Sequence, residues 1–138
     1  MAAELSALRV ELTTHVEAMT TRAPAGAARR EERLRERIKS LLDGVNIDQG
    51  RILTEVAIWA EKSDVTEELA RLRAHLDQLA LTLDKGGPMG RSLDFLLQEL
   101  NREVNTVASK ADDLELSQIA LGAKSVLEKM REQVQNLE

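Results

Sequence analysis

The sequence predicts an all-α fold, a soluble bundle of helical hairpins with about five or six helices and an extended helical arm at the N-terminus. Leu and Val recur at alternating steps of three and four residues along most of the chain, which places them on one face of successive helices. The 138 residues contain one Trp, one Phe and no Tyr, so aliphatic side chains must build the core. This composition disfavours a β-sandwich or barrel. The length suits one compact helical domain, or a smaller domain with an arm.

The N-terminal segment up to residue 42 is expected to form two helices. The first, at about 3–22, carries an apolar face made of Leu5, Leu8, Leu12, Val16 and Met19. Pro24 and Gly26 then interrupt it, because Pro disfavours helical geometry in the residue before it and Gly loosens the backbone. The second helix, at about 27–42, has Arg/Glu-rich outer faces and an apolar face made of Leu34, Ile38, Leu41 and Leu42.

A third helix is expected at about 49–62. The segment 44–48 ends the preceding helix, and Asp48 is suited to cap the next one, because its carboxylate can accept from free N–H groups of a first turn. The apolar face of this helix is made of Ile52, Val56 and Trp59. We interpret Trp59 as a core residue, although an exposed Trp could also stack on a base.

Two longer apolar stripes follow and predict an antiparallel helical hairpin. Asp64 and Glu67 have the three-residue spacing of a capping box, and a heptad-like stripe then runs through 65–83. The stripe stops at the Gly-Gly-Pro segment 86–88 and resumes through 93–111. Two stripes joined by so short a turn should pack against each other.

A last helix is expected after the hairpin. Asp112 and Glu115 resemble another capping box, and the apolar stripe that follows them runs almost to the C-terminus. Heptad-like stripes on at least three helices leave more apolar surface than one small domain covers, so the pattern also predicts oligomerisation.

Composition and missing motifs narrow the classes of function. With no Cys there is no thiolate metal site, and two His are too few for an imidazole cluster, so carboxylates would bind any metal. The sequence has no Gly-rich phosphate loop, no His-Glu-x-x-His motif and no Ser/His/Asp arrangement. No window approaches the roughly 18 apolar residues of a membrane span, so a cytoplasmic protein with no membrane partner is expected. The net charge of −5 and pI near 5.2 mean that any nucleic-acid binding must be local.

The helix that begins near Gly90 has an unusual polar face opposite its Leu/Val stripe. Six side chains cluster there at 3.6 residues per turn, namely Asp94, Gln98, Asn101, Arg102, Asn105 and Ser109. Asn and Ser are mediocre helix formers that suit directed hydrogen bonding, so a solvated face gains little from them. The face is interpreted either as a hydrogen-bonding surface between helices or subunits, or as a ligand site.

Three groups of charged or titratable residues have two interpretations each. Glu99 and Glu103 lie one turn apart, where like charges repel unless a divalent cation compensates them or Arg102 pairs with Glu99. His75 could donate to a phosphate or could be a structural hydrogen-bonding residue. A line of arginines could track phosphates or form an ordinary solvated Arg/Glu face, and it comprises Arg29, Arg33 and Arg37.

Two segments closely resemble the YicC/YloC family of bacterial endoribonucleases. They are GRSLDFLLQELNREVNTVASK at 90–110 and REQVQNLE at 131–138. The segments EVA at 55–57 and DVTEELARLRAH at 64–75 look like the preceding helices of the same family. The resemblance covers 48–138 well and 1–47 weakly. We therefore divide the chain into a helical arm or linker region at 1–47 and a YicC-like C-terminal helical domain at 48–138.

The resemblance implies a stress-associated, metal-dependent endoribonuclease that cuts single-stranded RNA and assembles with copies of itself, as a ring-like hexamer in the full-length form. DNA is not specifically implied as a partner. The family also has an N-terminal α/β domain that opens on a Met-Thr-Gly-Phe-Gly type motif. That motif is absent here, so the chain is expected to be a C-terminal portion or a reduced member of the family. Gly122 stands in a helix that is usually free of Gly, and we expect it to loosen packing.

Two hypotheses follow from the resemblance. In the first, the chain serves a ribonuclease with catalytic carboxylates from Asp94, Glu99 and Glu103, and the last two bind Mg²⁺ or Mn²⁺. The RNA-binding residues would be Arg91, Arg102 and Lys110 at phosphates, Gln98, Asn101, Asn105 and Ser109 at ribose, phosphate or base edges, and His75. In the second, the chain is a non-catalytic oligomerisation scaffold, and the activity lies in the N-terminal domain. Catalysis is expected of the full-length protein rather than of this portion alone.

Overall fold

The described part of the chain is entirely helical wherever it has regular structure, which confirms the predicted all-α class. The computed structural model describes residues 2–44, 48–111 and 113–137. The helices in these ranges are α1 (Ala2–Leu41), α2 (Gln49–Ser63), α3 (Thr66–Lys85), α4 (Gly90–Lys110) and α5 (Leu114–Leu137). They are one fewer than the segments expected along the sequence, because the first two of those segments form a single helix.

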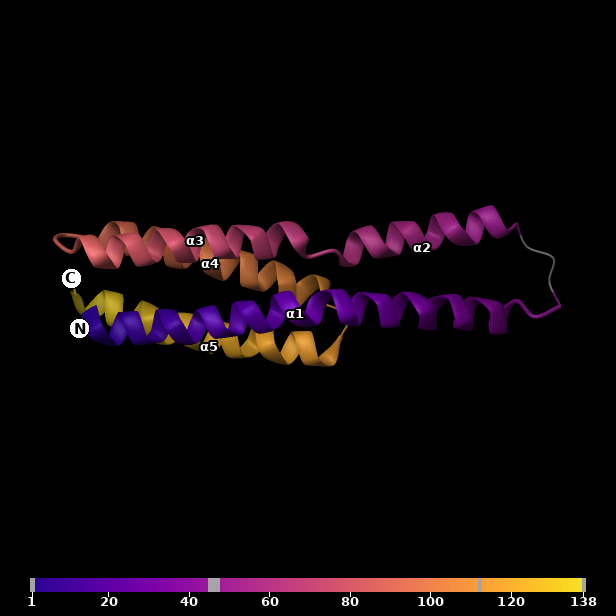
Figure 1. Cartoon of the computed structure of the whole chain (residues 1–138), viewed down its shortest axis with the longest axis horizontal. Coiled ribbons are helices and arrows are strands. Elements are labelled where there is room, and N and C mark those ends of the chain that lie inside the picture. Colours follow the sequence, from indigo (N-terminus) through magenta and orange to yellow (C-terminus); the bar gives the residue numbers. More distant parts are fainter. Residues whose placement is uncertain (1, 45–47, 112, 138) are drawn as a thin grey trace.

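The first half of α1 packs with α3, α4 and α5 in a four-helix bundle (Figure 1). Each of these helices runs antiparallel to its two neighbours, and the hairpin predicted for α3 and α4 is present. On each of the four bundle helices, residues three and four positions apart face inward, and their buried side chains join into one continuous aliphatic core. None of the described helices is long and apolar enough to cross a membrane.

The second half of α1 and α2 form an antiparallel arm that projects beyond the bundle (Figure 1). Val56 is the buried residue of α2, and it lies outside the core cluster of the bundle. Leu41, which was expected on a buried face, is 72% exposed. Trp59 is half-buried rather than in the core, with the Arg30 guanidinium carbon 5.5 Å from its ring centroid. These differences arise because two helices alone cover only one side of each other.

The break predicted at Pro24 and Gly26 is wrong, since α1 continues through both residues. Pro24 removes one backbone donor from the helix, and the residue itself is exposed. Contacts with the start of α5 hold the helix on either side. Arg22 binds Asp113 through Nε–Oδ2 (2.7 Å) and Nη2–Oδ1 (3.0 Å), and a Cβ on Gly26 would lie 3.0 Å from Asp113 Oδ2. Tertiary contact therefore overrides the local breaker signal.

Aspartates at the helix starts follow the predicted capping in part. Asp48 caps α2 as predicted, accepting from the N–H of the second helical residue at 2.9 Å. Asp64 lies one residue outside the N-cap position of α3, yet its Oδ1 still accepts from the Thr66 N–H at 2.9 Å. Asp112 lies outside the described residues. Its neighbour Asp113 accepts from the N–H three residues along, at 3.3 Å, and so satisfies one donor of the first turn of α5.

Gly122 marks a close approach of α5 to α1, whereas the sequence suggested looser packing. A Cβ at Gly122 would lie 2.7 Å from Nε2 and 2.9 Å from Cδ2 of His15, closer than non-bonded atoms pack. The His15 ring is held over this position by a hydrogen bond between Nδ1 and the Glu11 carbonyl at 2.9 Å. The missing side chain therefore makes room for the imidazole between the two helices.

Candidate functional site

The polar residues singled out on α4 lie together on one exposed face of that helix. We name it the α4 polar face, and it comprises Arg91, Asp94, Gln98, Asn101, Arg102, Asn105 and Ser109, all of which are exposed. The buried Leu and Val residues of α4 occupy the opposite side. Since the helix rises about 1.5 Å per residue, the face extends over about 27 Å from its first to its last residue.

Among the described residues, the amide and hydroxyl groups of this face have no partner on the neighbouring helices. Hydrogen bonds from α4 side chains in the described part of the chain involve Glu103, Thr106 and Lys110, and none of these belongs to the α4 polar face. The interpretation as a hydrogen-bonded surface between helices of one chain is therefore wrong for this face. Contact with another subunit or with a ligand remains open to it.

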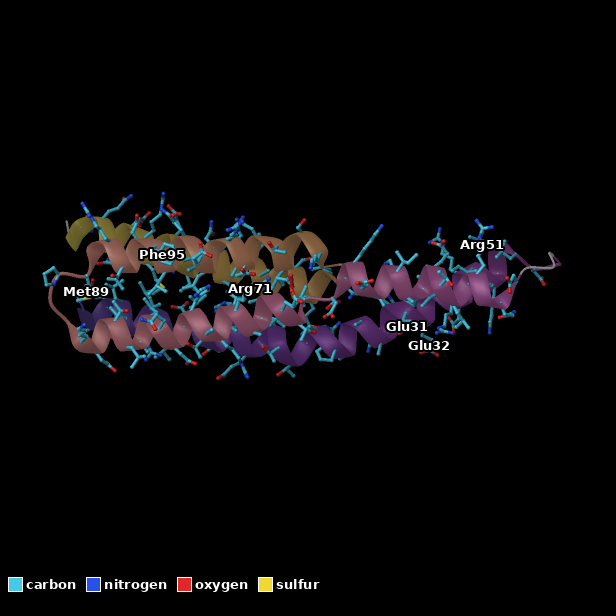
Figure 2. The ribbon with its side chains drawn as sticks, turned by 90° about the horizontal axis from the view of Figure 1, so that it is seen from above. Glu31, Glu32, Arg51, Arg71, Met89 and Phe95 are labelled. Carbon is cyan, nitrogen blue, oxygen red and sulfur yellow. The ribbon has the colours of Figure 1, made fainter. Side chains whose placement is uncertain are left out.

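Glu103 does not lie on the α4 polar face, because it points into the contact between α3 and α4. Its carboxylate is buried, with 7% of the residue exposed, and Oε1 accepts from Arg71 Nε at 2.9 Å. Figure 2 shows Arg71 reaching from α3 toward α4. The hydrogen bond to Glu103 raises the pKa of Arg71 above its ordinary value, so this guanidinium stays charged.

Lys110 is held in a second ion pair of the same helix contact. Its Nζ lies 2.8 Å from Oε1 of the buried Glu68, and it also donates to the Asp64 carbonyl at 3.2 Å. The hydrogen bond with Glu68 raises the pKa of Lys110. Arg71 lies between the two carboxylates, with Nη2 at 3.7 Å from Glu68 Oε1. We refer to Glu68, Arg71, Glu103 and Lys110 as the α3–α4 ion-pair cluster.

The metal site expected at Glu99 and Glu103 depends on how the carboxylates are arranged. Glu103 is engaged by Arg71, and Glu99 is half-buried one turn away. Hard divalent cations in proteins take several oxygen ligands. Across the described ranges, no three His, Asp or Glu side chains gather where they could hold a metal ion. The described residues of one chain therefore do not gather enough ligands for Mg²⁺ or Mn²⁺ by themselves, and the metal site stays a prediction. The alternative, a pairing of Arg102 with Glu99, is not among the ion pairs of the described residues.

His75 is half-buried on α3, one turn beyond Arg71. In the antiparallel register that pairs Arg71 with Glu103, His75 lies level with Glu99 on α4. Its proposed contact with phosphate stays a prediction. The same holds for the catalytic roles of Asp94, Glu99 and Glu103.

Glu68 and Arg71 were missed at the level of sequence. Their i, i+3 spacing on a predicted helix is common on solvated faces, and nothing local distinguishes it. The predicted hairpin could have revealed that these two residues lie close to Glu103 and Lys110. Folding the chain back at residues 86–88 brings position 71 level with position 103, and it brings position 68 near position 110.

Comparisons with known proteins extend the resemblance over nearly the whole chain. The family model described as Endoribonuclease YicC-like, C-terminal, matches residues 19–138. A probable endoribonuclease YicC of Clostridioides difficile (strain 630) is 43% identical over 138 residues, which cover 99% of this chain and 47% of that protein. A probable endoribonuclease YicC of Haemophilus influenzae (strain ATCC 51907 / DSM 11121 / KW20 / Rd) is 39% identical over 127 residues, covering 92% and 44%. Similarity thus reaches further toward the N-terminus than the motifs indicated. The chain spans less than half the length of these curated relatives.

Proposed function

Because the chain belongs to the YicC-like endoribonuclease family, we propose that it is the C-terminal helical module of an enzyme that cleaves single-stranded RNA. In this proposal the α4 polar face contacts the RNA. The observation that carries it is the continuous line of exposed amide, hydroxyl and Arg side chains that have no partner on neighbouring helices within the described residues. Such groups match the ribose hydroxyls, phosphates and base edges that proteins read in unpaired RNA.

The two arginines of the face supply its attraction for phosphate. Arg91 and Arg102 are 11 positions apart, which is about 16 Å along the helix. Lys110 is already paired with Glu68, so we assign it a structural role rather than a contact with phosphate. Arg91 and Arg102 are the two cations of the face, and neither forms an ion pair within the described residues; with a net charge of −5 as well, binding should depend weakly on salt. For single-stranded RNA, two neutralised phosphates correspond to a log–log slope of about −1.4.

The proposal is tested by fluorescence anisotropy with a labelled single-stranded RNA. Arg102→Ala should weaken binding and reduce the magnitude of the salt slope by about 0.7, because one phosphate contact is lost. Arg131→Ala on α5 is the matched control, since its partner Glu128 is equally exposed and such pairs contribute little to stability. Equal affinities for the wild type and Arg102→Ala would remove the α4 polar face from the RNA interface. Cleavage of the same RNA with and without Mg²⁺ or Mn²⁺ tests the metal prediction.

A second function, that of an oligomerisation scaffold, is favoured by Phe95. This residue, the only Phe in the sequence, is 60% exposed on α4 beside the α4 polar face (Figure 2). Two Leu side chains of α5, Leu114 and Leu121, are also exposed. Exposed apolar groups of this size are common where subunits meet. Sedimentation equilibrium of Phe95→Ala and the wild type separates the two functions. If this face joins subunits, the variant should dissociate and show a lower mass than the wild type. If the face binds only RNA, the two proteins should have the same mass.

A further inference from the structure

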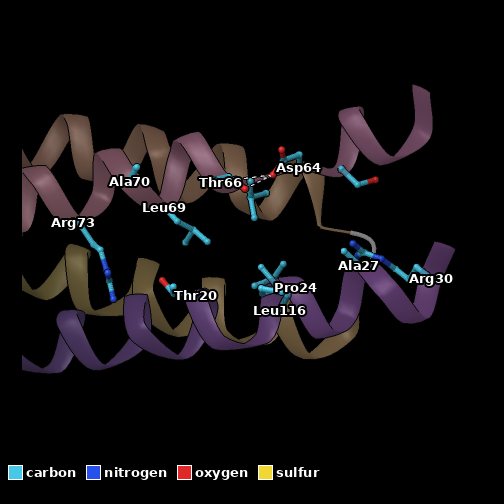
Figure 3. Close-up of a pocket in the computed structure, with 13 residues that line it drawn as sticks. Thr20, Pro24, Ala27, Arg30, Asp64, Thr66, Leu69, Ala70, Arg73 and Leu116 are labelled. Carbon is cyan, nitrogen blue, oxygen red and sulfur yellow. Dashed lines mark hydrogen bonds between the residues drawn. The ribbon is translucent and has the colours of Figure 1, made fainter. Parts of the chain in front are cut away.

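A cavity of about 400 Å³ lies where the arm joins the bundle. We call it the junction pocket. It is bounded by α1 on one side, by the connection from α2 into α3 on the other, and by the start of α5 (Figure 3). It adjoins the end of α4, because Lys110 donates to the carbonyl of Asp64 and Asp64 lines the pocket. Its volume is within the range of small-molecule sites.

The walls of the junction pocket are mainly apolar. Leu69 of α3 points across the opening toward Pro24 of α1 and Leu116 of α5 (Figure 3), and Ala27 and Ala70 also line the pocket. Two opposed apolar walls suit a flat apolar group, such as a nucleobase, better than a small inorganic ion. The pocket is open at the surface, so one unit of a longer polymer could occupy it while the rest of the polymer stays outside.

Arg30 lines the pocket and carries buried polar atoms that have no hydrogen-bond partner among the described residues. Its Nε and Nη1 atoms are buried, and neither has a hydrogen-bond acceptor among the described residues. The guanidinium carbon lies 5.5 Å from the ring centroid of Trp59, and the group forms no ion pair within the described part of the chain. Buried N–H groups of a cation without acceptors are costly, so a bound anion would satisfy them. Arg73 lines the same pocket and extends from α3 toward α1 (Figure 3).

One acidic group also lines the pocket, and it is already engaged. Oδ1 of Asp64 accepts from the Thr66 N–H at 2.9 Å, and hydrogen bonds from Thr66 hold the pKa of Asp64 below its ordinary value. Asp64 forms no ion pair with Arg30 within the described residues. The carboxylate therefore stays bound at the start of α3, and Nε and Nη1 of Arg30 have no acceptor among the described residues.

We propose that the junction pocket binds one nucleotide unit of the RNA, with its base between the apolar walls and its phosphate on Arg30, while Arg73 lies at the other end of the pocket (Figure 3). The proposal rests on the proposed ribonuclease function and adds a second contact to it, separate from the α4 polar face. Planar guanidinium groups bind phosphate through paired N–H donors, and Arg planes also stack on unpaired bases. An anion with a flat apolar body is thus the ligand class that satisfies both features of the pocket.

Trp59 provides the assay, because it is the only Trp in the sequence and lies against Arg30. Adenosine 5′-monophosphate, adenosine and inorganic phosphate are titrated into the chain while Trp emission is recorded with excitation at the red edge of its absorption. The nucleotide should change the emission and bind at least about tenfold more tightly than either of the other two, since only it fills both parts of the pocket. Equal binding of inorganic phosphate and the nucleotide would overturn the proposal, as would binding of neither.

Variants are compared by isothermal titration calorimetry, which does not depend on Trp59. Arg30→Met should weaken nucleotide binding by about tenfold or more, because a charged hydrogen-bonding group is lost. Arg33→Met, an exposed Arg on the same helix that does not line the pocket, is the matched control and should bind as the wild type does. Arg30→Lys keeps the charge without the planar fork and should be intermediate, which guards against a folding defect in Arg30→Met.

Failure of this inference differs from failure of the proposed function. If Arg30→Met and Arg33→Met bind the nucleotide equally while Arg102→Ala weakens RNA binding, the pocket assignment is wrong and the α4 polar face stands. If the nucleotide result holds but Arg102→Ala binds RNA normally, the pocket is retained and the α4 polar face is removed from the interface.

Discussion

Replacing Glu103 by Gln is expected to destabilise the fold, because the carboxylate is buried in the contact between α3 and α4. Oε1 accepts from Arg71 Nε at 2.9 Å, and only 7% of Glu103 is exposed. A hydrogen bond to a charged group contributes about 1.5–3 kcal/mol. The Arg71 side chain is 48% exposed and can return to water, and the Gln amide oxygen can still accept. We therefore expect a loss of about 1–2 kcal/mol in the free energy of unfolding.

Thermal and urea unfolding followed by circular dichroism measure this loss. For a chain of this size, 1 kcal/mol corresponds to about 3–5 °C in Tm. Glu99→Gln is the matched control, because it makes the same substitution one turn away at a half-buried position without an ion pair among the described residues. Its free energy of unfolding should stay within about 0.5 kcal/mol of the wild type.

A double-mutant cycle with Arg71→Gln decides whether the pair itself is responsible. A coupling energy of about 1 kcal/mol between Arg71→Gln and Glu103→Gln is expected. Additive effects would refute the reasoning, since the loss would then come from burial of the amide and not from the ion pair. Because Glu103→Gln perturbs stability, a fall in RNA cleavage is interpreted more directly in Glu99→Gln, where folding should be unaffected.

Two further substitutions test the contacts of α1 with α5. Asp113→Ala removes the Arg22 ion pair and a helix cap, so we expect a loss of about 2–3 kcal/mol by urea unfolding at pH 7. Arg22 lowers the pKa of Asp113 from its ordinary 3.8, so the stabilisation is present above that pH and disappears as the pH falls through the lower folded value. A gap between wild type and variant that persists below that value would contradict this account. Gly122→Ala should stabilise the His15→Ala variant by about 1 kcal/mol but not the wild type, because the added Cβ then meets no imidazole. Equal effects in both backgrounds, measured by thermal unfolding, would show that His15 does not restrict that position.

The sequence alone determined the all-α class, the described helices after α1 with most of their ends, and the α4 polar face. These features depend on residues within one or two turns of each other, so spacing at three and four positions is sufficient to predict them. Asp48 as a helix cap and the turn at residues 86–88 are of the same kind. The exposure of the α4 polar face followed from the Leu/Val stripe opposite, because a helix can bury only one side against the bundle.

Tertiary structure decided the features that join residues far apart in the chain. Pro24 reads as a helix end until Arg22 is seen bound to Asp113, 91 positions away. Glu103 appeared as one of a surface pair of carboxylates, yet its partner lies on α3, and only the rotation of α4 about its axis turns it inward. Such contacts depend on how whole helices pack, and the periodicity of each helix carries no information about the rotation of its neighbour.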